Sequence, residues 1–469
     1  MDFAETSALA LSKALATGEI SAKELMAATL ARIDVVNREV NAIVSLKPDD
    51  ALLVEAETAD QTARKGWLHG MPIAIKDLAN AQGFPTSKGS PIFAGQMATQ
   101  DDLMVARLRA AGAIVIGKTN TPEFGLGSHT FNPVHGPTKN PYDTSKSAGG
   151  SSGGAAVALA TGMLSIADGS DMMGSLRNPA GWNNVYGMRP TWGVVPAHPE
   201  GEAFMSQLST DGPMARSPAD LAALLDTMAG PDPRVPMPTQ VAPTLPQIDA
   251  RFTAPKVAWL GDWSGAFPTE KTVLTFCETA LVGMEQMGWN IETVSAPFDA
   301  DAMWTSWIDL RSYLVAMRRR EDYRDPTRCN LLKPAMIWEI ERGLKMRGET
   351  IQVASEIRSD WFRTAAELFA DFDVLVLPSA QLWPFDVGLE HPIEIAGAQM
   401  DTYHRWMQIV VPASLIGLPV VNFPIGFGAQ GLPMGLQLIG KPGSDGFLLQ
   451  IAQKWHEATG WPQKRPAMV

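Results

Sequence analysis

The sequence contains little cysteine: only Cys277 and Cys329 occur among its 469 residues. Two cysteines cannot build the disulfide framework of a secreted protein of this size, so we expect a chain that works in a reducing compartment. The seven histidines show none of the spacings of metal ligands, and the two cysteines lie far apart. We therefore expect neither a catalytic metal nor another cofactor.

Basic residues and long apolar runs are also scarce. The 38 lysines and arginines are outnumbered by 50 aspartates and glutamates, which gives a formal net charge of -12 at pH 7. Such a surface repels polyphosphates and anionic bilayers, so we expect no nucleic-acid and no membrane partner. The longest apolar stretches, residues 155–167 and 409–427, are short or interrupted. Asp2 and Glu5 stand where a secretory signal needs basic residues, and we expect a cytoplasmic protein.

The order of apolar segments indicates the fold class. Hydrophobic residues make up 45% and charged residues 19% of the chain, as in a globular enzyme. Short apolar segments alternate with helical patterns, and we expect strands at residues 72–75, 113–116, 257–260, 374–377, 420–423 and 436–439. This alternation predicts an α/β fold, a single large domain with a central mixed, mainly parallel β-sheet covered by helices on both faces.

Two serines flanked by glycine are the first chemical signal. Ser151 lies in Gly-Gly-Ser-Ser-Gly-Gly, residues 149–154, and Ser175 follows Gly174. Lys76 ends the strand expected at 72–75, which favours a serine nucleophile activated by an amine. The first serine also fits the G-x-S-x-G nucleophile elbow, but residues 140–147 before it are polar and turn-like rather than a strand. Taken alone, this motif also fits a glycine-rich turn into a helix that begins near Gly154.

A second glycine motif has the letters of a phosphate-binding loop. Residues 112–119 match G-x-x-x-x-G-K-[ST]. The interval between the glycines, Ala113–Ile116, is apolar and fits a buried strand, and Pro122 interrupts the helix that should follow. We therefore expect no nucleotide site here.

Ordered blocks along nearly the whole chain resemble the amidase signature family of serine hydrolases. These blocks are the Pro-Ile-Ala-Ile-Lys-Asp segment at 72–77, the glycine-serine segment at 149–154, the D-x-x-G-S-x-R-x-P segment at 171–179, and residues 117–124, 183–191 and 419–440. By motif position, the resemblance implies that Ser175 is the nucleophile, Ser151 a bridging serine that follows a cis peptide, and Lys76 the base.

The implied chemistry sets a condition on Lys76. A lysine accepts a proton only when it is neutral, and its ordinary pKa is about 10.4. Lowering the pKa to near 7 requires a dry, tightly packed site, with which the apolar neighbours Ile73, Ala74 and Ile75 agree. A carboxylate beside the amine would oppose the shift, so we expect Asp77 to face away.

The resemblance also implies an oxyanion hole made of the backbone N–H groups of Met172, Met173, Gly174 and Ser175. It implies supporting roles for Ser152, Asp171 and Arg177, and for the last two we expect either a structural ion pair or separate contacts with the backbone. Family members commonly carry a small polar residue and glycine where this chain has Met172 and Met173. Methionine does not readily adopt the positive φ angles open to glycine, so either the backbone is ordinary there or the turn is altered.

The expected regions follow from these assignments. The amidase signature domain covers residues 1–469, with an N-terminal helical region at 1–70 that contains a capping box at Ser21–Glu24. The catalytic core with the lysine and both serines covers 71–230, and a proline-rich surface excursion covers 231–255. Residues 256–469 hold the second half of the sheet and the variable segments of the substrate pocket.

The expected activity is hydrolysis of a small-molecule carboxylic amide through an acyl-enzyme; the same groups would cleave esters, hydrazides or carbamates. Tryptophan is abundant, and five residues are pocket candidates that favour an apolar or aromatic acyl group, although core packing is the alternative for each: Trp182, Trp304, Trp307, Trp338 and Trp383. Two other functions stay open, the amidase subunit of a tRNA-dependent amidotransferase and a noncatalytic binding protein on the same fold. Homodimers are common in this family, although the sequence itself does not give the oligomeric state.

Overall fold

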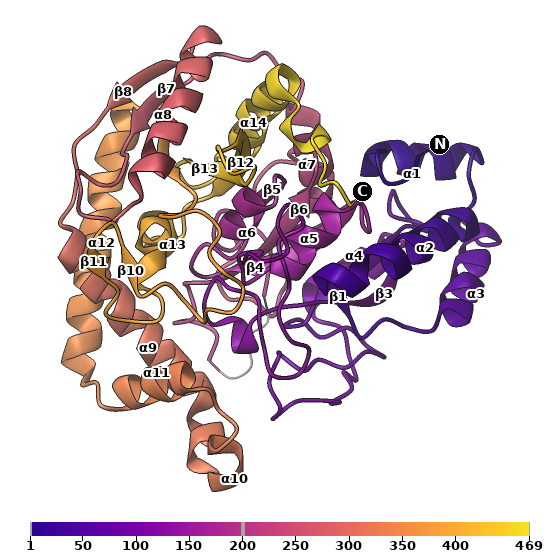
Figure 1. Cartoon of the computed structure of the whole chain (residues 1–469), viewed down its shortest axis with the longest axis horizontal. Coiled ribbons are helices and arrows are strands. Elements are labelled where there is room, and N and C mark those ends of the chain that lie inside the picture. The colour runs from indigo at the N-terminus through magenta and orange to yellow at the C-terminus, as the bar shows by residue number, and fades with distance from the viewer. Residues whose placement is uncertain (1, 198–201, 469) are drawn as a thin grey trace.

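Three helices open the chain in a computed structural model that describes residues 2–197 and 202–468. They are α1 (Ala8–Thr17), α2 (Ala22–Val40) and α3 (Asp49–Asp60), and they lie at one side of the molecule in Figure 1. Helix α2 begins at the expected capping box: the Glu24 N–H donates to Ser21 Oγ, and the Ser21 N–H donates to the Glu24 carboxylate. The helical prediction for the N-terminal region agrees with these three elements.

A small sheet next to these helices carries the candidate base. Its strands are β1 (Ile43–Val44), β2 (Pro72–Lys76) and β3 (Ile114–Thr119), in the order β1-β3-β2, and β3 follows helix α4 (Leu103–Ala110). Strand β2 ends at Lys76, as the apolar run predicts. Strand β3 is buried throughout and continues through Gly117 and Lys118. The segment with phosphate-loop letters is therefore a strand, as expected.

Among the described residues, eight strands form the main sheet. In spatial order they are β4 (Ile166–Asp171), β6 (Thr210–Ala215), β5 (Tyr186–Arg189), β12 (Val420–Phe427), β13 (Pro433–Ile439), β9 (Val374–Pro378), β7 (Lys256–Trp259) and β8 (Asn290–Thr293). The sheet is mixed, as expected, but the expectation of mainly parallel pairing is wrong. Only β9–β7 and β7–β8 are parallel, and the other five pairings are antiparallel. Strands β12 and β13 form a hairpin across residues 428–432, which requires antiparallel pairing.

Helices cover both faces of this sheet, as expected. Successive side chains of a strand point to opposite faces. On β12, Phe423 packs against Trp455 of α14 (Asp445–Thr459), with ring centroids 5.7 Å apart. The neighbouring Asn422 points to the opposite face, which α6 (Arg177–Trp182) covers. Helix α6 lies so close to this face that a Cβ added to Gly435 of the adjacent strand β13 would be 2.9 Å from Gly181 Cα. Helix α7 (Pro218–Met228) packs beside α14, and α5 (Gly153–Ala160) lies with α6.

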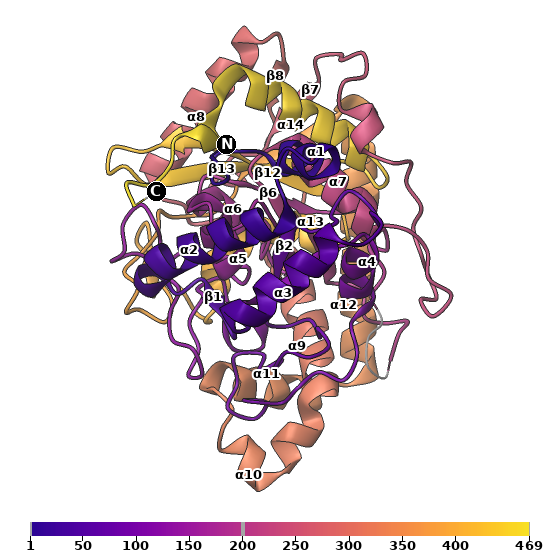
Figure 2. The same ribbon diagram turned by 90° about the vertical axis from the view of Figure 1, so that its right-hand side faces the viewer.

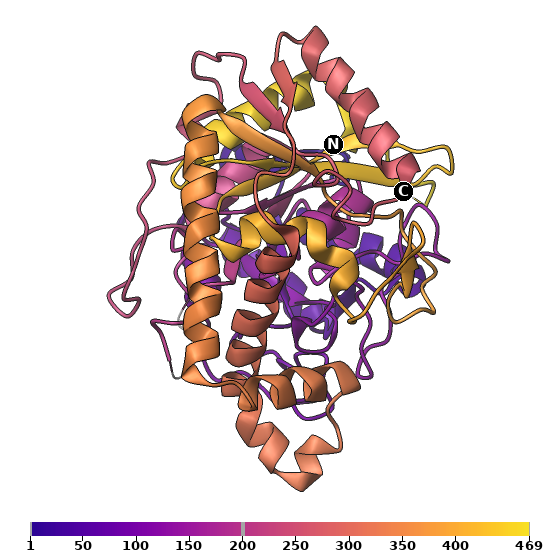
Figure 3. The same ribbon diagram turned by 90° about the vertical axis from the view of Figure 1, so that its left-hand side faces the viewer.

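The C-terminal half adds further helices. The longer ones are α8 (Lys271–Gln286), α9 (Ala300–Arg324), α11 (Pro334–Leu344) and α12 (Gly348–Asp371), and the short ones are α10 (Pro326–Cys329) and α13 (Val411–Leu415). Figure 3 shows α12 running beside α9, and α10 forms the lower tip in Figure 2. Short elements complete the chain: η1 (Glu123–Gly125), η2 (Leu245–Gln247), β10 (Glu394–Ile395), β11 (Ala398–Gln399), η3 (Arg405–Val410) and η4 (Trp461–Gln463). Across residues 2–197 and 202–468, none of the helices combines the length and apolar character needed to cross a bilayer.

Two helical glycines give a test of the packing between α9 and α11. A Cβ on Gly343 of α11 would overlap the Ser312 carbonyl oxygen of α9, whereas a Cβ on Gly283 of α8 would meet nothing closer than 3.8 Å. We expect Gly343→Ala to lower the free energy of unfolding by about 1 to 3 kcal/mol because the helices must separate. The control Gly283→Ala should raise it by about 0.5 to 1 kcal/mol. Urea unfolding measures both, and equal effects would contradict the close packing.

Candidate active site

Lys76 projects its amine into a buried cluster of serine hydroxyls. The residue is 1% exposed, and its Nζ donates to Ser151 Oγ at 2.8 Å, to Ser152 Oγ at 2.8 Å and to Ser170 Oγ at 3.1 Å. Burial lowers the pKa of Lys76 to about 7, although nearby carboxylates, foremost that of Asp168, act in the opposite direction. A substantial fraction of this amine is therefore neutral near pH 7.

Asp168, rather than the sequence neighbour Asp77, holds the backbone of Lys76. The Lys76 N–H donates to Asp168 Oδ1 of β4 at 3.1 Å, which joins the small sheet to the main sheet. Burial raises the pKa of Asp168 to about 6. Asp77 faces away from the amine, as expected: it accepts hydrogen bonds from Ser87 and lies 3.6 Å from Lys118 Nζ. Lys118 is thus a buried partner of Asp77.

Ser151 and Ser152 belong to the glycine-rich turn that leads into α5. The Gly150–Ser151 peptide is cis, as the resemblance implied. Bends and two isolated bridges, rather than a regular strand, precede the turn, so it differs from a nucleophile elbow. Helix α5 begins at Gly153, one residue before the expected position. A Cβ on Gly153 would overlap Thr130, and one on Gly154 would overlap the Asn120 backbone. The turn packs so closely against these residues that only glycine fits.

Ser175 lies directly beside this turn, between β4 and α6. Its carbonyl oxygen accepts a hydrogen bond from the Ser152 N–H at 3.1 Å. Ser175 is 5% exposed and Ser151 is 2% exposed. Within the described part of the chain, the Ser175 hydroxyl makes no hydrogen bond, including none to Ser151 Oγ. The structure therefore brings Lys76 and Ser151 into contact and holds Ser175 next to them with its hydroxyl uncommitted.

The turn before Ser175 keeps an ordinary backbone at both methionines. The positive φ falls on Gly174, at 79°, while neither Met172 nor Met173 is among the residues with positive φ. The Gly174 N–H donates to Asp171 Oδ1 at 3.0 Å, so the expectation that Gly174 supplies an oxyanion donor is wrong for this structure. The N–H groups of Met172, Met173 and Ser175 have no hydrogen-bond partner among the described residues, which leaves three donors around the nucleophile candidate.

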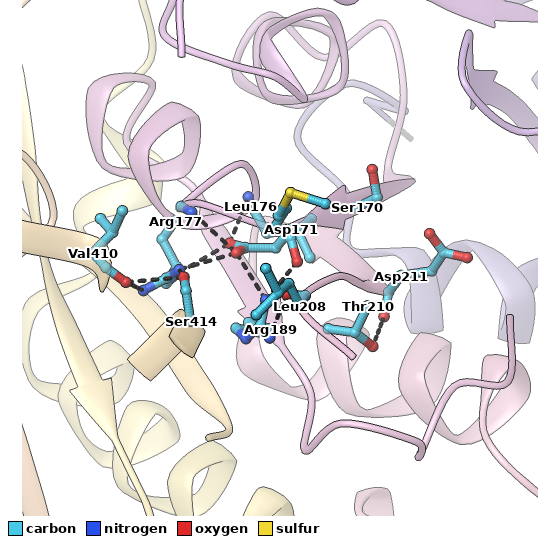
Figure 4. A network of polar contacts seen from close by, with 12 residues as sticks. Ser170, Asp171, Leu176, Arg177, Arg189, Leu208, Thr210, Asp211, Val410 and Ser414 are labelled. Carbon is cyan, nitrogen blue, oxygen red and sulfur yellow. Dashed lines mark hydrogen bonds and ion pairs between the residues drawn. The ribbon is translucent and has the colours of Figure 1, made fainter. Parts of the chain in front are cut away.

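A buried ion-pair network supports this turn (Figure 4). Asp171 accepts from Arg177 Nε at 3.0 Å and Nη2 at 2.9 Å, and it lies 3.2 Å from Arg189 Nη1. Burial acts to raise the pKa of Asp171, but the two guanidiniums outweigh it and hold that pKa well below its usual range. The expected pair of Asp171 with Arg177 is present. Arg189 was missed, although it lies in the 183–191 block.

The five candidate pocket tryptophans lie in four different surroundings. Trp182 of α6 is fully buried behind the turn of Ser151 and stacks on Trp406 at 6.0 Å. Trp304 and Trp338 both pack against His404. Trp307 is a fully buried core residue. Trp383 packs on Phe276 and donates to Thr272, both on α8, so its contacts place it against that helix rather than at the serine cluster.

Other residues at the site were not found from the sequence. Asp168 and Ser170 both reach Lys76, and their spacing of two along β4 puts them on one face, which is the signal that could have found them. Arg311 of α9 is a different case. Its Nη1 donates to Met172 Sδ at 3.2 Å, and the two residues are 139 positions apart in the sequence. No local sequence pattern predicts this contact.

Comparisons with known proteins identify the family of the chain. The Amidase family model matches residues 24–449. The chain belongs to the amidase signature family. The family and the fold expected from the sequence are therefore confirmed, and the chain is an amidohydrolase of this family.

Relatives with this fold cover almost all of the chain. An acylamidase of Rhodococcus erythropolis is 33% identical over 470 residues, covering 98% of this chain and 97% of that protein. A glutamyl-tRNA(Gln) amidotransferase subunit of Picosynechococcus is 32% identical over 490 residues, covering 98% and 99%. The structure of a 6-aminohexanoate cyclic dimer hydrolase superimposes with a TM-score of 0.88 at 26% identity over all of both chains. A bacterial aryl acylamidase reaches a TM-score of 0.91 at 24% identity, covering 98% and 99%, and shows the same fold.

Proposed function

We propose that this amidase hydrolyses small carboxylic amides through an acyl-enzyme on Ser175, with Ser151 as the bridging serine and Lys76 as the base. The observation that carries the proposal is the 2.8 Å contact between the buried Lys76 Nζ and Ser151 Oγ. The similarity to an acylamidase over 98% of the chain supports the same reaction class.

The proposed reaction begins with neutral Lys76. In this state the contact with Ser151 reverses its direction, and the Ser151 hydroxyl donates to Nζ. Ser175 attacks the amide carbon while its proton passes to Ser151 Oγ and the Ser151 proton passes to Lys76. The leaving amine takes the proton back through Ser151, and water then releases the carboxylic acid by the same route. Ser152 and Ser170 hold Nζ in line for these transfers.

The negative charge of the tetrahedral intermediate needs donors that are already in place. We assign this role to the backbone N–H groups of Met172, Met173 and Ser175, which have no other partner among the described residues. Asp171 supports them indirectly, because its carboxylate holds the Gly174 and Leu176 N–H groups and so fixes the turn. Trp304 and Trp338 would offer an apolar or aromatic surface to the acyl group.

Covalent labelling tests the proposed nucleophile. A fluorophosphonate or sulfonyl fluoride probe should modify Ser175, found by peptide mass spectrometry, because these reagents react with an activated serine. Ser175→Ala should abolish the label, while Ser151→Ala should slow it and leave its position unchanged. A folded wild-type protein that several such probes leave unmodified would favour the noncatalytic binding function instead.

The second candidate is a component of a tRNA-dependent amidotransferase, which the 32% identity to a glutamyl-tRNA(Gln) amidotransferase subunit favours. The first candidate predicts that the purified chain alone hydrolyses simple aryl amides and that tRNA or partner proteins do not raise the rate. Hydrolysis confined to glutamine and dependent on such partners would support the second candidate.

A further inference from the structure

Arg311 brings a buried positive charge to the turn of the proposed nucleophile. Its side chain is 4% exposed, and its Nε donates to Glu339 Oε1 at 2.7 Å while its Nη2 donates to the Tyr403 hydroxyl at 2.7 Å. The remaining nitrogen, Nη1, donates to Met172 Sδ at 3.2 Å. Met172 lies three positions before Ser175, so the guanidinium reaches the turn that would hold the reacting carbonyl.

The contact with Met172 leaves this nitrogen poorly satisfied. A thioether sulfur is a weak acceptor, whereas a buried guanidinium N–H gains most from a carbonyl or carboxylate oxygen. The rest of the cluster is well satisfied, because Glu339 also accepts from the Tyr403 hydroxyl at 2.8 Å and from Ser312 Oγ. Glu339 therefore balances the charge and fixes the orientation of Arg311, so Nη1 is preorganised for an oxygen that no described residue provides.

Two neighbours of Arg311 keep some exposed surface. Met172 and Tyr403 are only half-buried, although Met173, Gly174 and Ser175 beside them are buried. The guanidinium thus lies between two side chains that keep some exposed surface. Methionine is flexible and can move aside without leaving a rigid gap.

His404 adds further polar atoms next to this cluster. It is fully buried, and neither ring nitrogen has a hydrogen-bond partner among the described residues. Burial and the nearby guanidiniums hold the pKa of His404 well below its usual range, so the ring is neutral. Its ring centroid lies 5.1 Å from that of Trp304 and 6.0 Å from that of Trp338. Aromatic walls with a few polar groups are typical of small-molecule sites.

We propose that Arg311 determines specificity by binding an acceptor oxygen, a ketone, amide or carboxylate oxygen, on the acyl portion of the amide substrate. The oxygen displaces Met172 Sδ and accepts from Nη1, while Trp304 and Trp338 line the apolar remainder. The inference rests on the proposed function, since it places this portion next to the acyl carbon attacked by Ser175. The substrate class becomes an acyl amide with a second oxygen-bearing group.

Two matched series of 4-nitroanilides test this. The short series carries pentanoyl, 4-oxopentanoyl and succinyl groups, and the long series carries heptanoyl, 6-oxoheptanoyl and adipoyl groups, so that methyl, ketone and carboxylate ends are compared at two lengths. In at least one series, kcat/KM of the wild-type enzyme should be about tenfold or more higher with an oxygen end than with the methyl end. The ketone and carboxylate members show which oxygen the pocket prefers.

The variants separate Arg311 from general damage to the fold. Removing Arg311 alone strands the buried Glu339, so the test variant is the double change Arg311→Met with Glu339→Gln, which removes both charges. In this variant the ratio of kcat/KM for oxygen-ended over methyl-ended amides should fall to about 2 or less, because the donor that binds the oxygen is gone. Glu339→Gln alone is the matched control; it keeps Arg311 and should strengthen the preference for the carboxylate end.

Each result bears on the inference. Equal kcat/KM for oxygen and methyl ends in both wild-type series, or a preference that survives in the double variant, overturns it while the proposed function stands. If wild type cleaves none of the six, binding of the same amides to Ser175→Ala by isothermal titration calorimetry replaces turnover as the readout. Tighter binding of the oxygen-ended amides that is lost with Arg311 supports the inference, and equal affinities overturn it. Failure of the proposed function is seen separately, as absence of any label on Ser175.

Discussion

Replacing Lys76 with alanine is expected to lower kcat/KM for a simple aryl amide by about 10⁴-fold at pH 7. The variant loses the amine in contact with Ser151, while both serines remain. The loss should shrink as the pH rises, because hydroxide partly substitutes for the missing base. Wild-type kcat/KM should instead increase with pH along a titration curve whose midpoint is at a pH of about 7. The reason is that burial lowers the pKa of Lys76 to about 7 and only the neutral amine accepts a proton. Initial rates between pH 5 and 10 measure both profiles.

Lys118 offers a matched control for this experiment. It is also a buried lysine, one strand away on β3, but it pairs with Asp77 and does not touch the serines. Lys118→Met should reduce the stability of the fold. The folded variant should still show the wild-type increase of kcat/KM with pH on the acid side of the profile. A Lys76→Ala enzyme with more than a tenth of wild-type activity at pH 7 would contradict the proposed base.

Stability gives a second readout for Lys76 that does not depend on turnover. The pKa of this lysine is about 7 in the folded protein and about 10.4 in the unfolded chain. Between these values the unfolded state binds more protons, so this group makes the folded state more stable as the pH rises from about 7 to about 10.4. Lys76→Ala should flatten that slope in urea unfolding measured across the window. An unchanged slope would mean that the amine is not the neutral, buried group described above.

The second large effect is expected at Asp171. Asp171→Ala would leave the guanidiniums of Arg177 and Arg189 buried without their carboxylate, which costs about 3 to 5 kcal/mol for a broken buried pair. The total free energy of unfolding of a protein is only about 5 to 15 kcal/mol, so the melting temperature should fall sharply. Differential scanning fluorimetry measures the change, and Asp171→Asn should be milder because the amide keeps an acceptor oxygen.

The chain carries a matched surface control for this pair. Asp360 also pairs with an arginine, Arg363, at 2.6 Å, but the two side chains are 62% and 71% exposed. Exposed pairs add little because water and salt screen them, so Asp360→Ala should leave the melting temperature unchanged within error. Equal shifts for Asp171→Ala and Asp360→Ala would contradict a structural role for the buried network.

The sequence predicted those parts of the fold that rest on local patterns. The apolar run before Lys76 forms a strand because no polar side chain interrupts it, and Ser21 caps its helix because Glu24 lies three residues on. The pairing of the main sheet was not predictable in this way. Which strands become neighbours depends on segments as distant as β5 and β12, and the pattern of one strand does not encode its partner.

The same limit applies to the site. Lys76, Ser151 and Ser175 carry glycine-rich or strand-end contexts that mark them in the sequence. Arg311 and Tyr403 do not, because they meet the turn before Ser175 only after α9 and the segment before η3 fold against it. Residues that a fold brings together from distant helices have no local signature.

The bond from the Lys76 N–H to Asp168 has one further consequence. The amine belongs to the three-stranded sheet and Ser175 follows a strand of the eight-stranded one, so the proposed proton route crosses the boundary between these two sheets. A substitution far from the reacting atoms could therefore slow the reaction by shifting one sheet relative to the other. Each sheet would keep its own structure.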